Sequence, residues 1–237
     1  MTPRRKPFGA ALADFLAARL AHVQNGAEIS ALVSEVRARA VEHAGELRPS
    51  LDEPPMACAA GCDHCCHLRV DTSPLEVMAL AWWLDQFLDA SEKTRLRDRV
   101  ELALSESRGL SEEKFAAAHI ACPLLANGRC TAYEVRPFDC QGYMSADARV
   151  CEQARSNYDI QAIPINGRRY KAFVEARRAL NRVSIREGRD AAVLELISAL
   201  HIVLAGDDVV ARWLAGEPVF AGAAIDAPHS ARRNPRT

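Results

Sequence analysis

Eight cysteines constrain this chain more than any other feature, because all of them lie between residues 58 and 151 of a 237-residue sequence. They form two groups of four: Cys58, Cys62, Cys65 and Cys66, then Cys122, Cys130, Cys140 and Cys151. Thiolates at spacings of two or three residues can point several sulfur atoms at one centre, which is how soft metals and iron–sulfur clusters are held. The spacing therefore predicts a metal or cluster site.

The composition indicates a cytosolic protein with a sizeable core. Hydrophobic residues make up 49% of the chain, and the formal net charge of −1 gives no general attraction to nucleic acid or to a membrane surface. The longest apolar stretches are too short for a transmembrane helix, and the basic start of the chain is not followed by the apolar region of a signal peptide. In a reducing cytosol we expect the cysteines to be metal ligands rather than disulfides, and the partner to be another protein.

Helical patterns dominate the sequence. Capping signals mark three helix starts, since Ser73 precedes Pro74 and Glu76, and both Ser91 and Ser111 precede a glutamate. Further helices are predicted on both sides of Asn25-Gly26, from Pro74 to about Leu88, from about Arg169 to Arg186, from Asp190 to Gly206, and through Trp213. The helix from Pro74 is apolar nearly all round, so we expect it at the buried centre of the fold.

The cysteine-rich part is expected to be an insert in this helical framework. Asn127-Gly128 predicts a tight β-hairpin turn between short strands. The fold class is therefore predicted to be mainly α, a helical bundle-like domain with a small cysteine-rich loop and β-hairpin that bind metal. The predicted organisation is an N-terminal helical segment (1–48), a cysteine-cluster metal-binding core (49–155), C-terminal helices (156–221) and a disordered tail (222–237).

We expect the two cysteine groups to close over one centre, with Cys151 reaching in from the next helix and the helix of residues 74–88 as the floor. Positive charge close by would come from Arg69, Arg129 and Arg136, because a site of several thiolates is negatively charged. His64, His67 and His119 lie beside the cysteines and could bind metal, but polar loop residues are the favoured interpretation.

The cysteine motifs resemble those of a known family. Cys58-x3-Cys62-x2-Cys65-Cys66, then Cys122-Pro-Leu-Leu, Gly128-Arg129-Cys130, Tyr133 and Arg136-Pro137-x2-Cys140, are similar to the YkgJ-type cysteine-cluster family, described as a zinc- or iron-chelating domain. The likeness covers about residues 56–152. It extends to a domain of flagellin lysine methylases whose cysteines are associated with an iron–sulfur cluster.

The resemblance implies which residues act in the site. Its presumed metal ligands are Cys58, Cys62, Cys65, Cys66, Cys122, Cys130 and Cys140, with Cys151 as a less constant addition. Tyr133, Arg136 and Pro137 match positions that shape the site. Gln141 stands where many members carry arginine, which would leave that side less basic. The implied cofactor is zinc or iron, including a 4Fe-4S cluster.

Three functions stay open from the sequence. The first is a metal- or cluster-binding protein with a redox or protein-modification accessory role, and the second is a structural zinc module for protein–protein interaction. The third is a cluster-dependent enzyme of methyltransferase or radical type, since Cys58-x3-Cys62-x2-Cys65 has the radical S-adenosylmethionine spacing. That signature belongs to a β/α barrel, which the scarcity of strand patterns here disfavours. No common catalytic motif is present, so no catalytic residue is predicted.

Overall fold

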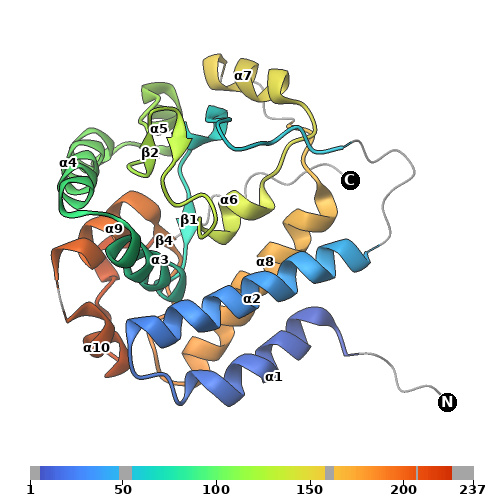
Figure 1. Cartoon of the computed structure of the whole chain (residues 1–237), viewed down its shortest axis with the longest axis vertical. Coiled ribbons are helices and arrows are strands. Elements are labelled where there is room, and N and C mark those ends of the chain that lie inside the picture. Colours follow the sequence, from blue (N-terminus) through green and yellow to red (C-terminus); the bar gives the residue numbers. More distant parts are fainter. Residues whose placement is uncertain (1–5, 48–54, 158–162, 207, 226–237) are drawn as a thin grey trace.

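Helices build the framework of the chain, and the cysteine-rich segments lie at one end of it (Figure 1). The computed structural model describes residues 6–47, 55–157, 163–206 and 208–225. Within these residues the fold is mainly helical with two small antiparallel sheets of two strands each, which confirms the predicted fold class. The boundary predicted at residue 49 and residues 226–237 of the predicted tail lie outside the described residues.

One layer consists of three long helices that lie side by side in Figure 1: α1 (Phe8–Leu20), α2 (Gly26–Glu46) and α8 (Gly167–Arg186). The break predicted at Asn25-Gly26 is the start of α2. The Asn25 side chain accepts a hydrogen bond from the Glu28 backbone N–H at 3.0 Å, which satisfies one of the unpaired donors of the first turn. Apolar residues of all three helices, including Leu16, Val36 and Leu180, are completely buried where these helices meet.

A second group of helices contains α3 (Pro74–Phe87), which packs against α9 (Leu196–Ala205). Its other members are α4 (Ala90–Ser107), α5 (Glu112–Ala118) and α10 (Val209–Leu214). Every residue from Pro74 to Leu80 is buried, which confirms the predicted burial for the first half of this helix. In the second half only Leu84 is buried, and Phe87 is 64% exposed. Ser73 and Ser111 cap their helices as predicted. The prediction for Ser91 was wrong, because Asp89 caps α4 with a reciprocal Glu92 contact and Ser91 only donates to the Asp89 carboxylate.

A two-residue ladder joins two distant parts of the chain. Strand β1 (Asp71–Thr72) pairs antiparallel with β4 (Leu194–Glu195), and Thr72 lies opposite Leu194. The helix predicted from Asp190 therefore begins later, at Leu196, where the Glu195 carboxylate accepts hydrogen bonds from two backbone N–H groups of the first turn. Both strands are buried. Strands this short leave no alternating pattern in the sequence.

The remaining elements are short. The predicted hairpin is confirmed as β2 (Leu125–Ala126) and β3 (Arg129–Cys130), joined by Asn127 and Gly128 with φ of 52° and 71°. Two positive φ values are those of a type I′ turn, for which Asn-Gly is the preferred pair. The other short elements are η1 (His64–His67), α6 (Phe138–Gly142), α7 (Ala148–Ser156) and η2 (Ala221–Ala223).

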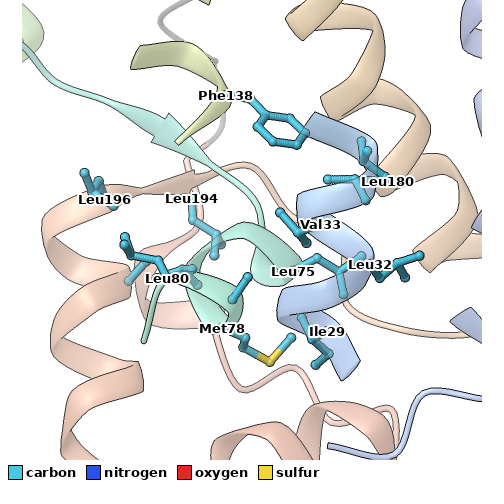
Figure 2. Packing of buried hydrophobic residues seen from close by; sticks show 14 of the residues in the cluster. Ile29, Leu32, Val33, Leu75, Met78, Leu80, Phe138, Leu180, Leu194 and Leu196 are labelled. Carbon is cyan, nitrogen blue, oxygen red and sulfur yellow. The ribbon is translucent and has the colours of Figure 1, made fainter. Parts of the chain in front are cut away.

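One large apolar cluster unites the N-terminal helices, the middle of the chain and the C-terminal helices. Figure 2 shows its centre, where Leu75 and Met78 of α3 lie on the side of Ile29 and Val33 of α2. Leu80 lies on the other side of α3, toward Leu196, and Phe138 lies at one edge. Since Phe138 belongs to α6, the core reaches to within two residues of Cys140 and so anchors part of the cysteine-rich region. In the described part of the chain, no helix combines the length and the apolar character that crossing a membrane requires.

Candidate metal centre

Seven of the eight cysteines line a single cavity of about 70 Å³. They come from the loop before η1, from η1 itself, from the hairpin region and from α6. The seven are Cys58, Cys62, Cys65, Cys66, Cys122, Cys130 and Cys140. All eight cysteines are half-buried and none is in a disulfide. The structure thus brings together seven of the predicted ligands, from three separated stretches of sequence.

Backbone hydrogen bonds fix the first group. The Ala57 N–H donates to the Ser145 carbonyl oxygen at 2.9 Å, and the Ser145 N–H donates to the Cys58 sulfur at 3.1 Å. The chain then turns at Gly61, whose φ of 96° is readily accessible only to glycine, and the Cys62 N–H closes this turn onto Ala59. The turn and η1 together direct all four thiols of this stretch into the same cavity.

The second group is attached directly to the first. The Cys122 N–H donates to the Cys66 carbonyl oxygen at 2.7 Å, so the two cysteine groups are joined through the backbone itself. Two more backbone hydrogen bonds, from Leu125 to Cys122 and from Thr131 to Leu124, turn the chain into the hairpin that carries Cys130. This arrangement explains how cysteines more than fifty residues apart in the sequence share one cavity.

Burial makes these thiols hard to ionise. It raises the pKa of Cys122 to about 12 and that of Cys140 well above the usual value. The pKa of Cys65 is also well above its usual value, first through its hydrogen bond with Cys66 and then through burial. A buried thiolate needs a compensating cation, and a bound metal is the usual one for a cluster of thiols.

Arg136 supplies positive charge at the cavity, as the sequence predicts. Its guanidinium lies 3.9 Å from the Tyr133 ring centroid and donates to the Tyr133 carbonyl oxygen at 2.7 Å. Both residues line the cavity. The Arg136 charge opposes the rise in the pKa of Cys58, Cys65 and Cys130, each of which is raised overall. Arg69 and Arg129, which were also expected near the site, are not among the residues lining this cavity.

A second arginine approaches from α8, and no sequence motif indicates it. Arg169 donates to the Gln141 carbonyl oxygen at 2.7 Å, while the Gln141 side chain donates to the Arg136 carbonyl oxygen at 2.8 Å. Burial, together with the neighbouring charge of Arg136, lowers the pKa of Arg169. Arg169 does not line the cavity, but its guanidinium lies against the Gln141 backbone on the side that was expected to be less basic.

A buried charged cluster lies under the helix that carries Cys140. Glu76, only 4% exposed, accepts a hydrogen bond from the Phe138 N–H at 2.7 Å, and Arg177 of α8 is 2.6 Å from the Asp139 carboxylate. Burial raises the pKa of both Glu76 and Asp139, and the Arg177 charge opposes this rise. The sequence predicts that Glu76 is a helix-capping residue. Its hydrogen bond with Phe138, which lies 62 residues further along the chain, could not be predicted from the sequence.

Other predicted contributors lie outside the cavity lining. Cys151 on α7 is not a lining residue, although burial raises its pKa and the charges of Cys58, Cys62 and Cys65 raise it further. None of the three neighbouring histidines lines the cavity, and His67 Nδ1 instead lies 3.0 Å from the His119 carbonyl oxygen. The expected floor is also different, since the apolar lining consists of Val70, Leu124 and Leu196 among others, and includes no residue of α3.

The thiols surround a space and do not converge on a point. Among the described residues, no group of three or more His, Cys, Asp or Glu side chains is arranged to hold a single metal ion. A water molecule needs a cavity of about 10–15 Å³, so the 70 Å³ enclosed here accommodates a group of several atoms. Seven thiols with an adjacent guanidinium match the soft-ligand chemistry of a thiolate-bound metal centre.

Hard-metal chemistry fits this cavity poorly, because Ca²⁺ and Mg²⁺ prefer carboxylate and carbonyl oxygens and no Asp or Glu is among its lining residues.

The resemblance to the YkgJ-type family stays a prediction. Searches against protein-family models, curated proteins and solved structures find no match to this chain.

Proposed function

We propose that this protein binds an iron–sulfur cluster in the seven-cysteine cavity and serves in electron transfer or as the redox accessory of a protein-modifying system. The observation that carries the proposal is that cysteines from three separated segments line one cavity. Buried cysteines of unrelated role would be expected to scatter through the core as small apolar residues. Their collection around one space supports a shared ligand.

The size of the cavity and the number of thiols favour a cluster over a single zinc ion. A structural zinc site needs four ligands at about 2.0–2.3 Å from one point. Here seven thiols surround a space of about 70 Å³ without converging. A cluster holds several irons bridged by sulfide, and each iron can take its own cysteine.

The surroundings of the thiols support a redox role. The Ser145 N–H that donates to the Cys58 sulfur is the kind of hydrogen bond that raises a cluster's reduction potential, and the Arg136 charge stabilises the more negative, reduced state. Each cysteine is partly exposed as a whole residue, and burial raises the pKa of Cys122 and Cys140 more than that of Cys58, so the centre would approach the surface on the Cys58 side. Exchange of electrons with a partner protein requires that proximity.

Serine substitution of single cysteines tests the proposal. We expect anaerobically prepared Cys130→Ser and Cys140→Ser to lose most of the iron and sulfide of the unsubstituted protein, because both thiols line the cavity. Cys151→Ser is the matched comparison, since its thiol is outside the lining, and it should retain most of both. Far-UV circular dichroism shows whether each variant keeps its helices. Full iron and sulfide content in both lining variants would refute the placement.

A structural zinc module is the second candidate, and one observation favours it. Cys151 lies within electrostatic range of Cys58, Cys62 and Cys65, and four cysteines are the ligand number of a closed zinc site. These four side chains would have to move together to bind one ion, since they are not arranged to hold one here. This candidate predicts the reverse pattern. Zinc would be the only metal bound, and Cys151→Ser would lose it while Cys130→Ser retained it.

A further inference from the structure

A second and larger cavity lies apart from the cysteines. Its volume is about 440 Å³, within the range of about 300–1,000 Å³ typical of small-molecule sites. The walls come from α4 and the loop after it, from α5, from α9 and from η2. No cysteine lines it, and no residue that lines the cysteine cavity is shared with it.

The two cavities lie on opposite sides of one thin wall. Arg69 and Glu195 line the larger cavity, whereas their immediate neighbours Val70 and Leu196 line the cysteine cavity. The Leu196 N–H donates to the Val70 carbonyl oxygen at 3.0 Å, which continues the β1–β4 ladder. Arg69 and Val70 directly precede β1, where successive residues of extended chain point to opposite faces, whereas Glu195 ends β4 and Leu196 begins α9.

Positive charge without a described carboxylate partner marks the larger cavity. Arg69 makes one hydrogen bond, from Nη2 to the Leu110 carbonyl oxygen at 3.3 Å, and its guanidinium lies 5.1 Å from the Phe115 ring centroid. Its Nε is buried and has no hydrogen-bond partner. Arg108 lies exposed at the rim. Among the described residues, no carboxylate lies within ion-pair distance of either arginine.

The one carboxylate lining this cavity is already engaged. Both oxygens of Glu195 accept hydrogen bonds from the first turn of α9, at 2.9 Å from the Ile197 and Ser198 N–H groups. The Ser198 hydroxyl donates to the same carboxylate. Its negative charge is therefore held at the start of the helix, where the helix dipole favours it. The guanidinium groups remain the unpaired charges of the cavity.

The rest of the lining combines polar side chains (Ser107, Ser198 and His201) with an apolar part that suits a hydrocarbon body. Leu104, Leu110, Phe115 and Ile202 all contribute to it. A guanidinium pairs strongly with a carboxylate, and an apolar wall gains free energy from burying carbon. We propose that this cavity binds a small organic acid, with its carboxylate at Arg69 and its hydrocarbon chain or ring against the apolar wall. The proposal is independent of what the cysteines bind.

Isothermal titration with a series of carboxylates tests this site. The probes are butyrate, hexanoate and 3-phenylpropionate, with 3-phenylpropanamide as the neutral control. We expect 3-phenylpropionate to bind more tightly than butyrate, because it buries more carbon, and at least about tenfold more tightly than the amide, because only the acid pairs with Arg69. Binding should also weaken as salt concentration rises.

Three variants locate the binding site. Arg69→Met should weaken acid binding about tenfold or more, and Arg108→Met, an exposed change that does not threaten the fold, should weaken it about threefold. Arg97→Met, at an exposed position on α4 outside the cavity, should leave it unchanged. Three outcomes would overturn the proposal. They are equal affinity for the acid and the amide, no binding of any acid up to about 10 mM, and unchanged binding in both Arg69→Met and Arg108→Met. Metal content, measured in the same samples, reports separately on the cysteine centre.

Discussion

Replacing Arg177 by methionine would remove the counter-charge from a buried group of carboxylates while keeping most of the side-chain volume. Arg177 is 2.6 Å from Asp139, their side chains are 7% and 19% exposed, and the nearby Glu76 is 4% exposed. Breaking a buried ion pair by removal of one partner typically costs about 3–5 kcal/mol, because the other charge stays buried. For a chain of this length, that loss lowers the melting temperature by about 10 °C.

The pH dependence of this loss distinguishes an electrostatic cause from a packing defect. Burial already raises the pKa of Glu76 and Asp139, and removal of Arg177 would raise both further. When the pKa of a carboxyl is higher in the folded than in the unfolded state, the protein loses stability as the pH rises from the unfolded-state pKa to the folded-state pKa. The deficit of Arg177→Met relative to the unsubstituted protein should therefore be larger at pH 8 than at pH 5, because protonation of the carboxyls removes the uncompensated charge.

Urea unfolding at the two pH values measures the deficit, and Arg178→Met is the matched control. Arg178 is the next residue of α8 and is exposed, so its replacement should change the free energy of unfolding by less than about 0.5 kcal/mol. Metal content should also fall in Arg177→Met, because Asp139 adjoins Cys140. A deficit no larger than that of the control, or one that grows as the pH falls, would refute the reasoning.

Two further predictions concern the metal centre and the packing around it. Burial raises the pKa of the lining thiols, that of Cys122 to about 12, so a metal that binds them must displace protons. The apparent metal affinity, measured by chelator competition, should therefore rise from pH 6.5 to pH 8. An affinity independent of pH would contradict this prediction. Gly142→Ala places a methyl group 3.1 Å from the Phe173 Cβ and should cost about 1–3 kcal/mol in thermal unfolding. Gly167→Ala, with open space around the new methyl group, should cost far less, and equal losses would show that contact with Phe173 is not the cause.

The features that were predictable from the sequence are those coded locally. Asn127-Gly128 predicts the hairpin because both residues adopt positive φ, and Ser73-Pro74 predicts the start of α3 because the hydroxyl caps the first turn. The cysteine spacing likewise predicts a shared site, and seven of the eight thiols line one cavity. The turn and cap signals act within a few residues of the chain, and the cysteine spacing is local within each of the two groups.

The features that were not predictable depend on contacts between distant segments. The β1–β4 ladder joins Asp71 to Glu195 through strands of two residues, too short to leave a period in the sequence. The contact of Glu76 with α6 and the approach of Arg169 to Gln141 arise only when helices from three regions pack. The apolar wall of the cysteine cavity includes Leu196 of α9 and no residue of α3, because this wall too is set by how distant segments pack.

The central claim is that the cysteine cavity holds an iron–sulfur cluster. The most direct test is elemental analysis of the untagged protein, purified without oxygen, for iron, zinc and acid-labile sulfide in one sample with its visible spectrum. The account predicts a brown protein with iron and sulfide in equal amounts and an absorption band that bleaches on reduction. A colourless protein that holds zinc without sulfide, or one that binds neither metal, would contradict it.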